Sequence, residues 1–252
     1  MFLFSTDIDG TIYDGPETAE RFSEFWQRLR DSGTPPVLCY NTGRSLADTR
    51  DLISRTSLPE PDYIIAGVGT EMFHFGQEAM IPEWGDELSG GWDFEIVKTI
   101  VLESGVDIEM QPPECQNPFK CSWFFFEKEP SEIEALGLAI AEAGVQAQLV
   151  YSSNRDLDIL PCGANKGNAI GWLADKLGTP TENVLVAGDS GNDASMFDLK
   201  NASGIVVSNA EPALFAAIAE RHFRATDPCA DGVIEGITLR IETLHPDFFQ
   251  PG

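Results

Sequence analysis

Two carboxylates near the N-terminus, Asp7 and Asp9, are the residues whose spacing most directly predicts chemistry. They follow a short apolar run and precede Gly10, so we expect them in the loop that ends a buried strand. In open α/β sheets, sites lie outside the carboxyl ends of the strands. One carboxylate could attack phosphorus and form an acyl phosphate, while the other protonates the leaving oxygen. The pair therefore predicts phosphoryl transfer, with a divalent cation to offset the repulsion between the two charges.

Three further segments carry groups that a phosphoryl-transfer site needs. Thr42, Gly43 and Arg44 follow an apolar run, and a hydroxyl with free backbone amides at a strand-to-helix turn can hold phosphate oxygens. Lys166 opens a predicted helix, where a cation is unfavourable unless an anion lies opposite. The segment 188–193 follows another apolar run and offers several oxygen ligands for Mg2+.

Each of these motifs has a simpler explanation when taken alone. The pair Asp7 and Asp9 could belong to a capped turn, Thr42 could be a helix N-cap, and Lys166 could be a solvated surface cation. Their succession at four separate predicted element ends favours the catalytic interpretation, because an accidental set would scatter over helix faces and loops.

Helix and strand patterns alternate in the first and last parts of the chain. We expect strands at 1–4, 37–40, 63–66, 184–187 and 205–208, and helices at 17–32, 46–54, 165–177 and 211–220. Such alternation predicts an α/β fold whose core is a Rossmann-like parallel sheet with right-handed crossovers. Residues 245–252 should form an irregular end.

The pattern changes in the middle of the chain. We expect helices at 94–103 and 131–143, and strands at 106–110, 122–127, 148–151 and 157–160. Paired strands around helices predict an inserted α+β cap domain over residues 83–160, with residues 1–82 and 161–252 forming the core domain. A cap that excludes water would protect an acyl phosphate.

The four motifs resemble those of the haloacid dehalogenase-like phosphatases, and the resemblance spans the whole chain. It implies that Asp7 is the nucleophile and that Asp9 is the general acid and then the general base. It also implies that Thr42 and Lys166 hold the oxygens of the transferring phosphoryl group.

Mg2+ is the cofactor that this resemblance implies. Its ligands would be the carboxylates of Asp7 and Asp189 and the backbone carbonyl of Asp9, with Ser190 and Asp193 supporting that shell.

Within that superfamily, the segments 40–45, 69–71, 158–161, 188–193 and 206–210 look like the sucrose-phosphate phosphatase subfamily. The segment 117–122 resembles the cap segment with the family's sugar-side lysine, which is Lys120 here, although Phe119 stands where the family usually has His. The substrate contacts that we expect are Thr42, Gly43, Arg44, Lys120, Lys166 and Asn192.

The expected function is hydrolysis of a sugar phosphate, first of all sucrose 6-phosphate, through a phosphoaspartyl intermediate. A mannosylfructose-phosphate phosphatase or another sugar phosphatase remains an alternative. A phosphomannomutase-like enzyme would favour an arginine-rich cap, whereas residues 83–160 contain three lysines and Arg155. A non-catalytic phosphosugar-binding protein would be expected to lose Asp7 or Asp9.

Composition limits the partners. The formal net charge of −25, from 41 acidic and 16 basic residues, argues against nucleic acid and anionic membranes. No apolar run is long enough to span a membrane, and the N-terminal one is too short for a signal peptide, so we expect a cytoplasmic protein. The five cysteines show no Cys-x-x-Cys pair. We expect an upstream sugar-phosphate synthase to supply the substrate, and a monomer or weak dimer.

Overall fold

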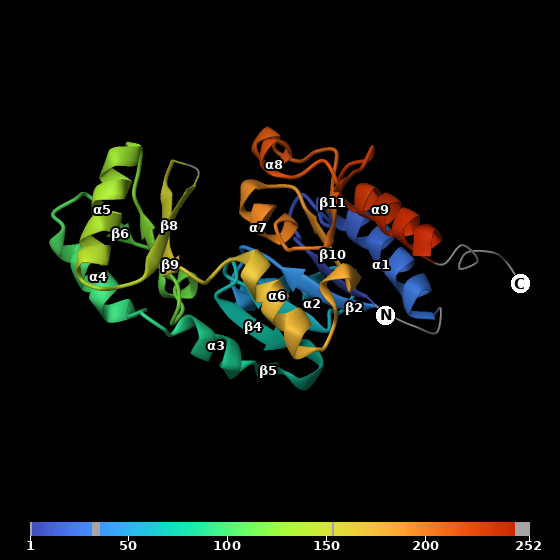
Figure 1. Ribbon diagram of the computed structural model, residues 1–252, viewed down its shortest axis with the longest axis horizontal. Coiled ribbons are helices and arrows are strands. Elements are labelled where there is room, and N and C mark those ends of the chain that lie inside the picture. Colours follow the sequence, from blue (N-terminus) through green and yellow to red (C-terminus); the bar gives the residue numbers. More distant parts are fainter. Residues whose placement is uncertain (1, 32–35, 153, 245–252) are drawn as a thin grey trace, which may run out of the picture. The chain divides into compact units, whose positions relative to one another are not determined.

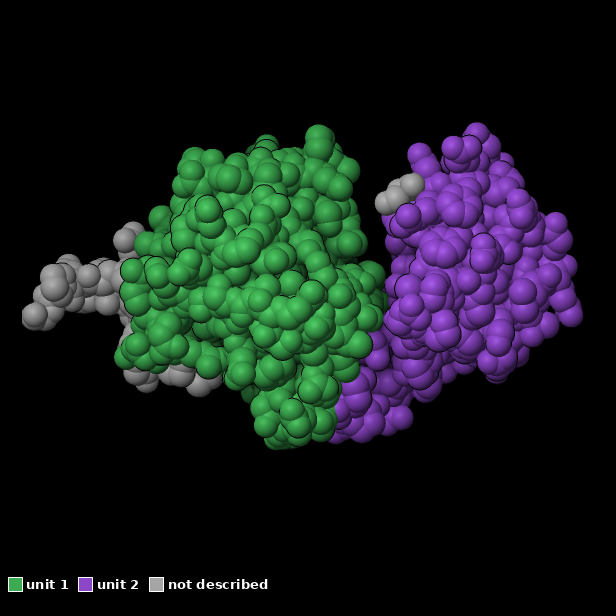
Figure 2. Space-filling model, turned by 180° about the vertical axis from the view of Figure 1, so that it is seen from behind, with its two compact units in different colours: residues 1–69, 73–79, 165–252 green, residues 70–72, 80–164 purple. Residues whose placement is uncertain are grey.

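The computed structural model describes residues 2–31, 36–152 and 154–244. Internal contacts divide the chain into two compact units, which Figure 2 shows in different colours. Unit 1 comprises residues 1–69, 73–79 and 165–252, and unit 2 comprises residues 70–72 and 80–164. Relative to the expected cap at 83–160, unit 2 extends a few residues further at both ends and includes a short piece of an earlier strand. The end expected at 245–252 lies outside the described residues.

An eight-stranded sheet forms the centre of unit 1 (Figure 1). Its order is β12 (Phe223–Arg224), β11 (Ser203–Val206), β10 (Val184–Gly188), β1 (Leu3–Thr6), β2 (Val37–Asn41), β3 (Tyr63–Ala66), β4 (Glu71–His74) and β5 (Ala79–Met80). The strands from β12 to β3 are parallel. The α/β, parallel-sheet core predicted from the alternation is therefore confirmed.

Helices cover both faces of this sheet. They are α1 (Pro16–Asp31), α2 (Leu46–Arg55), α6 (Lys166–Lys176), α7 (Ala194–Phe197), α8 (Pro212–Ala217) and α9 (Cys229–Leu244). On β1, the Phe4 ring contacts Phe22 and Trp26 of α1, whereas the Ser5 hydroxyl meets the sulfur of Met196 in α7. Since successive strand residues point to opposite faces, α1 and α7 lie on opposite sides. Helix α9 packs beside α1, and α6 packs beside α7.

Unit 2 is an α+β unit, as the change of pattern predicts. Its four-stranded antiparallel sheet has the order β6 (Glu109–Met110), β7 (Cys121–Phe124), β9 (Asp156–Pro161) and β8 (Ala147–Ser152). Its helices are α3 (Pro82–Leu88), α4 (Phe94–Glu103) and α5 (Pro130–Glu142). Buried side chains of α4, α5 and one sheet face form a separate core around Trp123 and Phe125. This core shows that unit 2 has its own hydrophobic stabilisation.

Some expectations differ from the structure. The strand expected at 106–110 is reduced to β6, and the helix expected at 211–220 ends at Ala217 because the next residue is extended. The sequence patterns did not predict β4, β5, β12, α3, α7 or α9. Within the part of the chain that the structure describes, no helix is both long enough and apolar enough to cross a membrane.

Candidate active site

The residues predicted to do chemistry meet at the carboxyl edge of the unit 1 sheet. Asp7 follows β1, Thr42 follows β2 and Asp189 follows β10, and these three strands are parallel neighbours. Their ends open onto a cavity of about 490 Å³. Its lining residues are Asp7, Asp9, Thr42, Gly43, Arg44, Asp189, Ser190 and Asn192. The topology therefore brings together segments that lie almost 200 residues apart in the sequence.

Lys166 completes the site through a buried contact with Asp7, which lines the cavity. The helix α6 begins at this residue, with the Asn165 side chain capping the helix by accepting from Asn168 N–H. The ammonium group is fully buried and lies 2.9 Å from Asp7 Oδ1 and 2.6 Å from Asp193 Oδ1. Burial alone would lower the pKa of Lys166, but the two carboxylates outweigh it and raise the pKa above its usual value. The lysine is thus a permanent cation held by two acids.

The surroundings of Asp7 raise the pKa of its carboxyl group. Burial raises the pKa of Asp7 to about 7, against the lowering effect of Lys166 and the raising effect of Asp193. Burial also raises the pKa of Asp189 to about 6, and the nearby Asp193 adds to that increase. A cation between these carboxylates would favour their charged forms, which is the form that a nucleophile needs.

The donor chemistry of the site fits a hard divalent cation. Asp7, Asp189 and Asp193 each offer an oxygen, and these oxygens lie within 4.8 Å of one another. Asp193 Oδ1 already accepts from Lys166, and its Oδ2 accepts from the backbone N–H groups of Asp189 and Ser190. Asp7 and Asp189 are thus better placed as direct ligands, while Asp193 shapes the loop that carries them. All these donors are oxygens, as Mg2+ prefers.

The loop after β1 and the loop after β10 touch each other. The Thr11 hydroxyl donates to Asp189 Oδ1 at 3.0 Å. Gly10 has a φ of +73°, and a Cβ there would collide with the Asp189 carboxylate. Only glycine both adopts this conformation readily and permits the approach. Sequence reasoning assigned no role to Thr11, although it closes the Asp-x-Asp-Gly-Thr motif.

Two polar residues, Asn41 and Thr42, lie at the end of β2, and Thr42 lines the cavity. Thr42 is almost fully buried, and its hydroxyl oxygen accepts from Arg44 N–H at 3.2 Å. The hydroxyl hydrogen can therefore be donated to an oxygen in the cavity. The preceding residue, Asn41, is fully buried, and its amide donates to the Lys166 carbonyl at 2.9 Å. Asn41 was not predicted, because a single polar residue in an apolar run gives no signal of its partner.

Arg44 is occupied by two carboxylates. Its Nε and Nη2 each lie 2.6 Å from an oxygen of Asp9, and its Nη1 lies 2.6 Å from Asp48 Oδ2. The hydrogen bond to Asp9 is the main cause that raises the pKa of Arg44. The bidentate geometry holds Asp9 in one orientation and occupies both of its oxygens, so Asp9 must release Arg44 before it can act as the expected general acid. Direct contact of Arg44 with substrate stays a prediction.

Lys120 belongs to unit 2 and is paired there. Its ammonium lies 3.0 Å from Asp158 Oδ2, and both side chains are mostly buried. The Ser122 hydroxyl donates to the other oxygen of Asp158 at 2.6 Å. Burial raises the pKa of the nearby Glu71 carboxyl, opposed by its hydrogen bond with Asn117 and by the charge of Lys120. These groups form a polar cluster that could bind hydroxyl groups.

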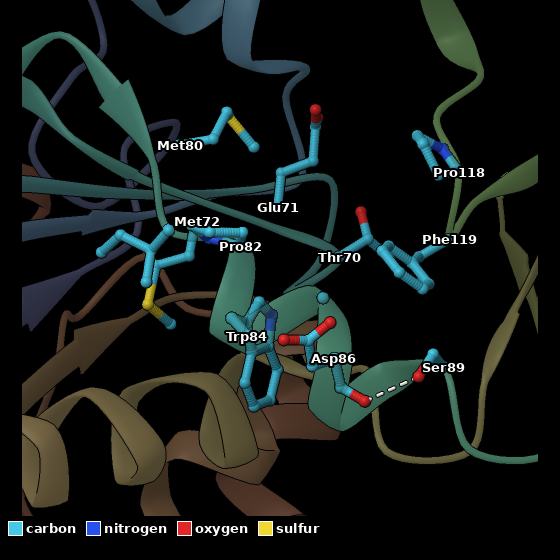
Figure 3. A pocket seen from close by; sticks show the side chains of 12 residues that line it. Thr70, Glu71, Met72, Met80, Pro82, Trp84, Asp86, Ser89, Pro118 and Phe119 are labelled. Atoms are coloured by element: carbon cyan, nitrogen blue, oxygen red, sulfur yellow. Dashed lines mark hydrogen bonds between the residues drawn. The ribbon is translucent and has the colours of Figure 1, made fainter.

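A second cavity, of about 310 Å³, lies within unit 2. Figure 3 shows side chains of α3, including Trp84 and Asp86, together with Pro118 and Phe119, around it. The Ser89 hydroxyl donates to the Asp86 carbonyl at 2.7 Å on its wall. The lining is largely apolar, and it includes the residue that immediately precedes Lys120.

The parallel sheet, the loop that carries Asp7 and Asp9, and the Lys166–acid cluster are features of a phosphatase of the haloacid dehalogenase-like class. The family model and the relatives described below confirm the predicted enzyme class, a phosphoric monoester hydrolase. Within that class, the family model described as sucrose-6F-phosphate phosphohydrolase matches residues 1–239. The chain belongs to this family, as the motifs predicted.

Relatives of this chain include enzymes for two different substrates. A mannosylfructose-phosphate phosphatase of Agrobacterium fabrum is 38% identical, with 97% of this chain and 98% of that protein covered. Probable sucrose-phosphatase 2 of Arabidopsis thaliana is 33% identical over 93% of this chain, which spans 58% of the plant protein. The structure of sucrose-phosphatase from Synechocystis sp. PCC6803 with sucrose and phosphate is 34% identical, with a TM-score of 0.82 and 94% and 97% of the two chains covered.

The raised pKa values predict how pH changes the effect of Mg2+ on stability. Without metal, Asp7 and Asp189 bind protons more tightly in the folded protein than in the unfolded chain, where both pKa values are near 3.8. Their contribution to stability is present below pH 3.8 and is lost as pH rises through about 6 and 7. Mg2+ must displace these protons, so we expect it to raise the melting temperature more at pH 8 than at pH 5.5.

Differential scanning fluorimetry at both pH values, with chelator or with Mg2+, measures this difference. Potassium chloride at matched ionic strength controls for screening of the large net charge. An equal Mg2+-induced shift at both pH values would contradict the assignment of the cation to these carboxylates.

Proposed function

We propose that this protein is a Mg2+-dependent phosphatase that removes phosphate from a phosphorylated disaccharide, with sucrose 6-phosphate as the first candidate. The observation that carries the proposal is the buried contact of Lys166 with Asp7 at the end of β1, beside Asp189. Such an arrangement supports a carboxylate nucleophile, Asp7, that faces a phosphoryl group. Lys166 and the proposed Mg2+ would be the two cations that stabilise the charge of the phosphoryl oxygens.

The residues divide the reaction into two steps. In the first, an oxygen of Asp7 forms a bond to phosphorus while the bond from phosphorus to the sugar oxygen breaks, and Asp9 gives that oxygen its proton. In the second, Asp9 takes a proton from water, whose oxygen attacks phosphorus and releases Asp7 and inorganic phosphate. Thr42 and Lys166 hold phosphoryl oxygens in both steps. When bound, Mg2+ supplies positive charge that stabilises the phosphoryl oxygens.

Asp7, the Asp9 carbonyl and Asp189 are the proposed metal ligands, with Ser190 and Asp193 as support. Gly43 and Asn192 lie close together on the cavity wall, where a Cβ on Gly43 would be 3.9 Å from Asn192 Nδ2. Their amide groups suit phosphate oxygens or the first sugar hydroxyls. We propose that Arg44, which lines the same cavity and donates hydrogen bonds to Asp9, also binds the substrate.

Two relatives of this chain are phosphatases named for different disaccharides, mannosylfructose and sucrose. Mannosylfructose phosphate is therefore the second candidate. The polar cluster of Lys120, Asp158 and Ser122 supplies donors and acceptors of the kind that recognise sugar hydroxyls. We propose that Lys120 contacts the sugar.

Two other functions fit less well. A phosphomutase would need a basic unit 2 for a bisphosphate, but the charged pairs of unit 2 place its cations against acids, as with Lys120 and Asp158. A non-catalytic sensor does not need Asp7 beside a buried lysine, with a second acid, Asp9, on the same cavity wall. The proposed setting is the cytoplasm, where a sugar-phosphate synthase supplies the substrate to a monomer or weak dimer.

A panel of phosphorylated sugars tests the function directly. Phosphate release should be fastest with sucrose 6-phosphate or mannosylfructose phosphate, slower with hexose monophosphates, and absent when a chelator replaces Mg2+. Release that continues unchanged in chelator would contradict the metal dependence. Formation of a hexose bisphosphate or an isomeric phosphate instead of free phosphate would favour the mutase.

Asp7→Asn should abolish turnover while leaving the protein folded. The amide has the shape of the carboxylate but cannot attack phosphorus, so we expect kcat to fall by at least about a thousandfold. The melting temperature in chelator should be retained, because Asp193 still pairs Lys166 and the buried Asp7 carboxylate is itself costly there.

Steady-state phosphate release and thermal melting measure the two effects. Asp14→Asn is the matched control, since this exposed acid lies a few residues along the chain and outside the cavity. Retained turnover in Asp7→Asn would exclude the phosphoaspartyl mechanism.

Lys120→Ala should raise KM for the sugar phosphate much more than KM for an aryl phosphate. The reason is that Lys120 is proposed to contact the sugar, which an aryl phosphate lacks, so an increase of about tenfold is expected for the sugar phosphate alone. Lys128→Ala is the control, because Lys128 is also in unit 2 and also pairs with an acid, Glu132.

The measurement is KM and kcat for both substrates in each variant. Equal effects of Lys120→Ala on the two substrates would remove Lys120 from sugar recognition. Equal effects of Lys120→Ala and Lys128→Ala would indicate that unit 2 had merely been destabilised.

A further inference from the structure

The turn after β11, residues 207–211, has no part in the function described so far. It lies in a segment that resembles the sucrose-phosphate phosphatase subfamily, yet none of its residues lines the cavity. Its chain reverses through a hydrogen bond from Ala210 N–H to the Val207 carbonyl at 3.1 Å, and α8 begins directly after it. Its polar groups point to other loops rather than to each other.

The Asn209 side chain of this turn binds the loop that carries Asp7 and Asp9. The Asn209 amide donates to the Gly10 carbonyl at 2.8 Å, across 199 residues of sequence. The Asn209 side-chain oxygen accepts from Cys229 N–H at 2.8 Å, at the start of α9. Asn209 is thereby fixed on one side to a long helix of unit 1 and on the other side to the loop that carries Asp7 and Asp9.

The same turn also holds the acidic loop after β10. Glu211 N–H donates to the Asp189 carbonyl at 2.7 Å. The Glu211 carboxylate accepts from Gly191 N–H at 3.3 Å. The turn therefore connects the two loops whose carboxylates, Asp7 and Asp189, are proposed to share a cation.

The hydrogen bond from Asn209 restrains the backbone around Gly10, next to the Asp9 carbonyl that is a proposed metal ligand. Gly10 N–H donates to the Tyr13 carbonyl at 3.0 Å, which fixes the peptide group containing the Asp9 carbonyl. The following peptide group is fixed by Thr11 N–H donating to the Ile8 carbonyl and by Asn209 donating to the Gly10 carbonyl. Glycine rotates freely about both dihedrals, so such bonds are needed to keep the Asp9 carbonyl in one direction.

We propose that Asn209 is a positioning residue for the cation site. By holding the Gly10 carbonyl, it keeps the Asp7–Thr11 loop aligned with the acidic loop that Glu211 holds. It touches neither the substrate nor the cation and acts through the backbone. This inference rests on the proposed Mg2+-dependent function, and it identifies a residue outside the four motifs that this function requires.

Asn209→Ala tests the proposal, because Asn209 is exposed and its loss leaves no buried hole. Loss of a group that orients metal ligands commonly costs 10-fold or more in metal affinity or activity. We expect the dissociation constant for Mg2+, measured by calorimetry without substrate, to rise about tenfold. We expect kcat to fall by a similar factor, with KM at saturating Mg2+ changed less than about twofold.

Ser208→Ala is the matched control. Ser208 is the exposed neighbour in the same turn, and its backbone N–H, which the substitution keeps, donates to the Asp227 carbonyl at 3.1 Å. This variant should retain wild-type Mg2+ affinity and kcat. A similar loss in both variants would overturn the proposal, since the effect would then come from the turn as a whole.

Asn209→Asp separates the two bonds of Asn209. The carboxylate keeps an oxygen for Cys229 N–H but cannot donate to the Gly10 carbonyl when it is charged. We expect kcat to fall at least as far as in Asn209→Ala, and a wild-type kcat would overturn the role of the Gly10 bond. A purely structural role predicts instead a lower melting temperature in chelator with unchanged Mg2+ affinity, which would also overturn the proposal.

These outcomes are distinguishable from failure of the proposed function. If the wild-type protein binds Mg2+ but releases no phosphate from any sugar phosphate, the proposed function fails, while calorimetry still decides whether Asn209 aligns the cation site. If the wild-type protein is active and Asn209→Ala matches it in Mg2+ affinity and kcat, the function stands and the positioning role fails.

Discussion

The structure of the site depends on one interaction, the burial of the Lys166 ammonium group between Asp7 and Asp193. Charges taken out of water are tolerated only when partners lie close and their hydrogen bonds are satisfied. Removing the lysine would leave two carboxylates buried beside each other, and breaking such a pair commonly costs about 3–5 kcal/mol. The order of strands in the sheet is what makes this contact possible, because it places β1 next to β10.

The contact also explains why we propose a further cation at this site. One ammonium group faces Asp7 and Asp193, and Asp189 adds a third carboxylate within the same small volume. The net charge of this cluster is therefore negative before any phosphate binds. Burial raises the pKa values of Asp7 and Asp189, and the charge of Asp193 adds to both increases. Arg44 neutralises Asp9 at the rim but does not reach this cluster. The proposed divalent cation beside Asp7 and Asp189 would restore the balance that an anionic substrate requires.

The residues that the sequence predicts to meet, and that do meet in the structure, are those whose chemistry is unusual for their expected place. A lysine in the first turn of a helix, such as Lys166, is unfavourable unless an anion lies close to it. An acid at the end of a buried strand, such as Asp7, likewise needs a partner, so both residues indicate a site. Asn41, Thr11 and Asn209 were missed because their partners lie far away in sequence and their types suit ordinary strands or turns. The helix α9 was missed as well, although its apolar positions pack on α1. Tertiary contacts, which one sequence does not reveal, decide such positions.

The overall charge and the local chemistry of the protein act over different distances. A formal net charge of −25 repels anions, yet at physiological ionic strength charges on the surface are screened beyond about 8 Å. Within the cavity the relevant charges are a few fixed groups at hydrogen-bond distance, where Lys166 and a cation outweigh distant acids. A surplus of surface acids is therefore compatible with a phosphorylated substrate, provided that the loops carrying Asp7 and Asp189 stay aligned. We propose that this alignment comes from the hydrogen bonds of the Gly10 and Asp189 carbonyls, so that loop packing sets the electrostatics of this site as much as its charged residues do.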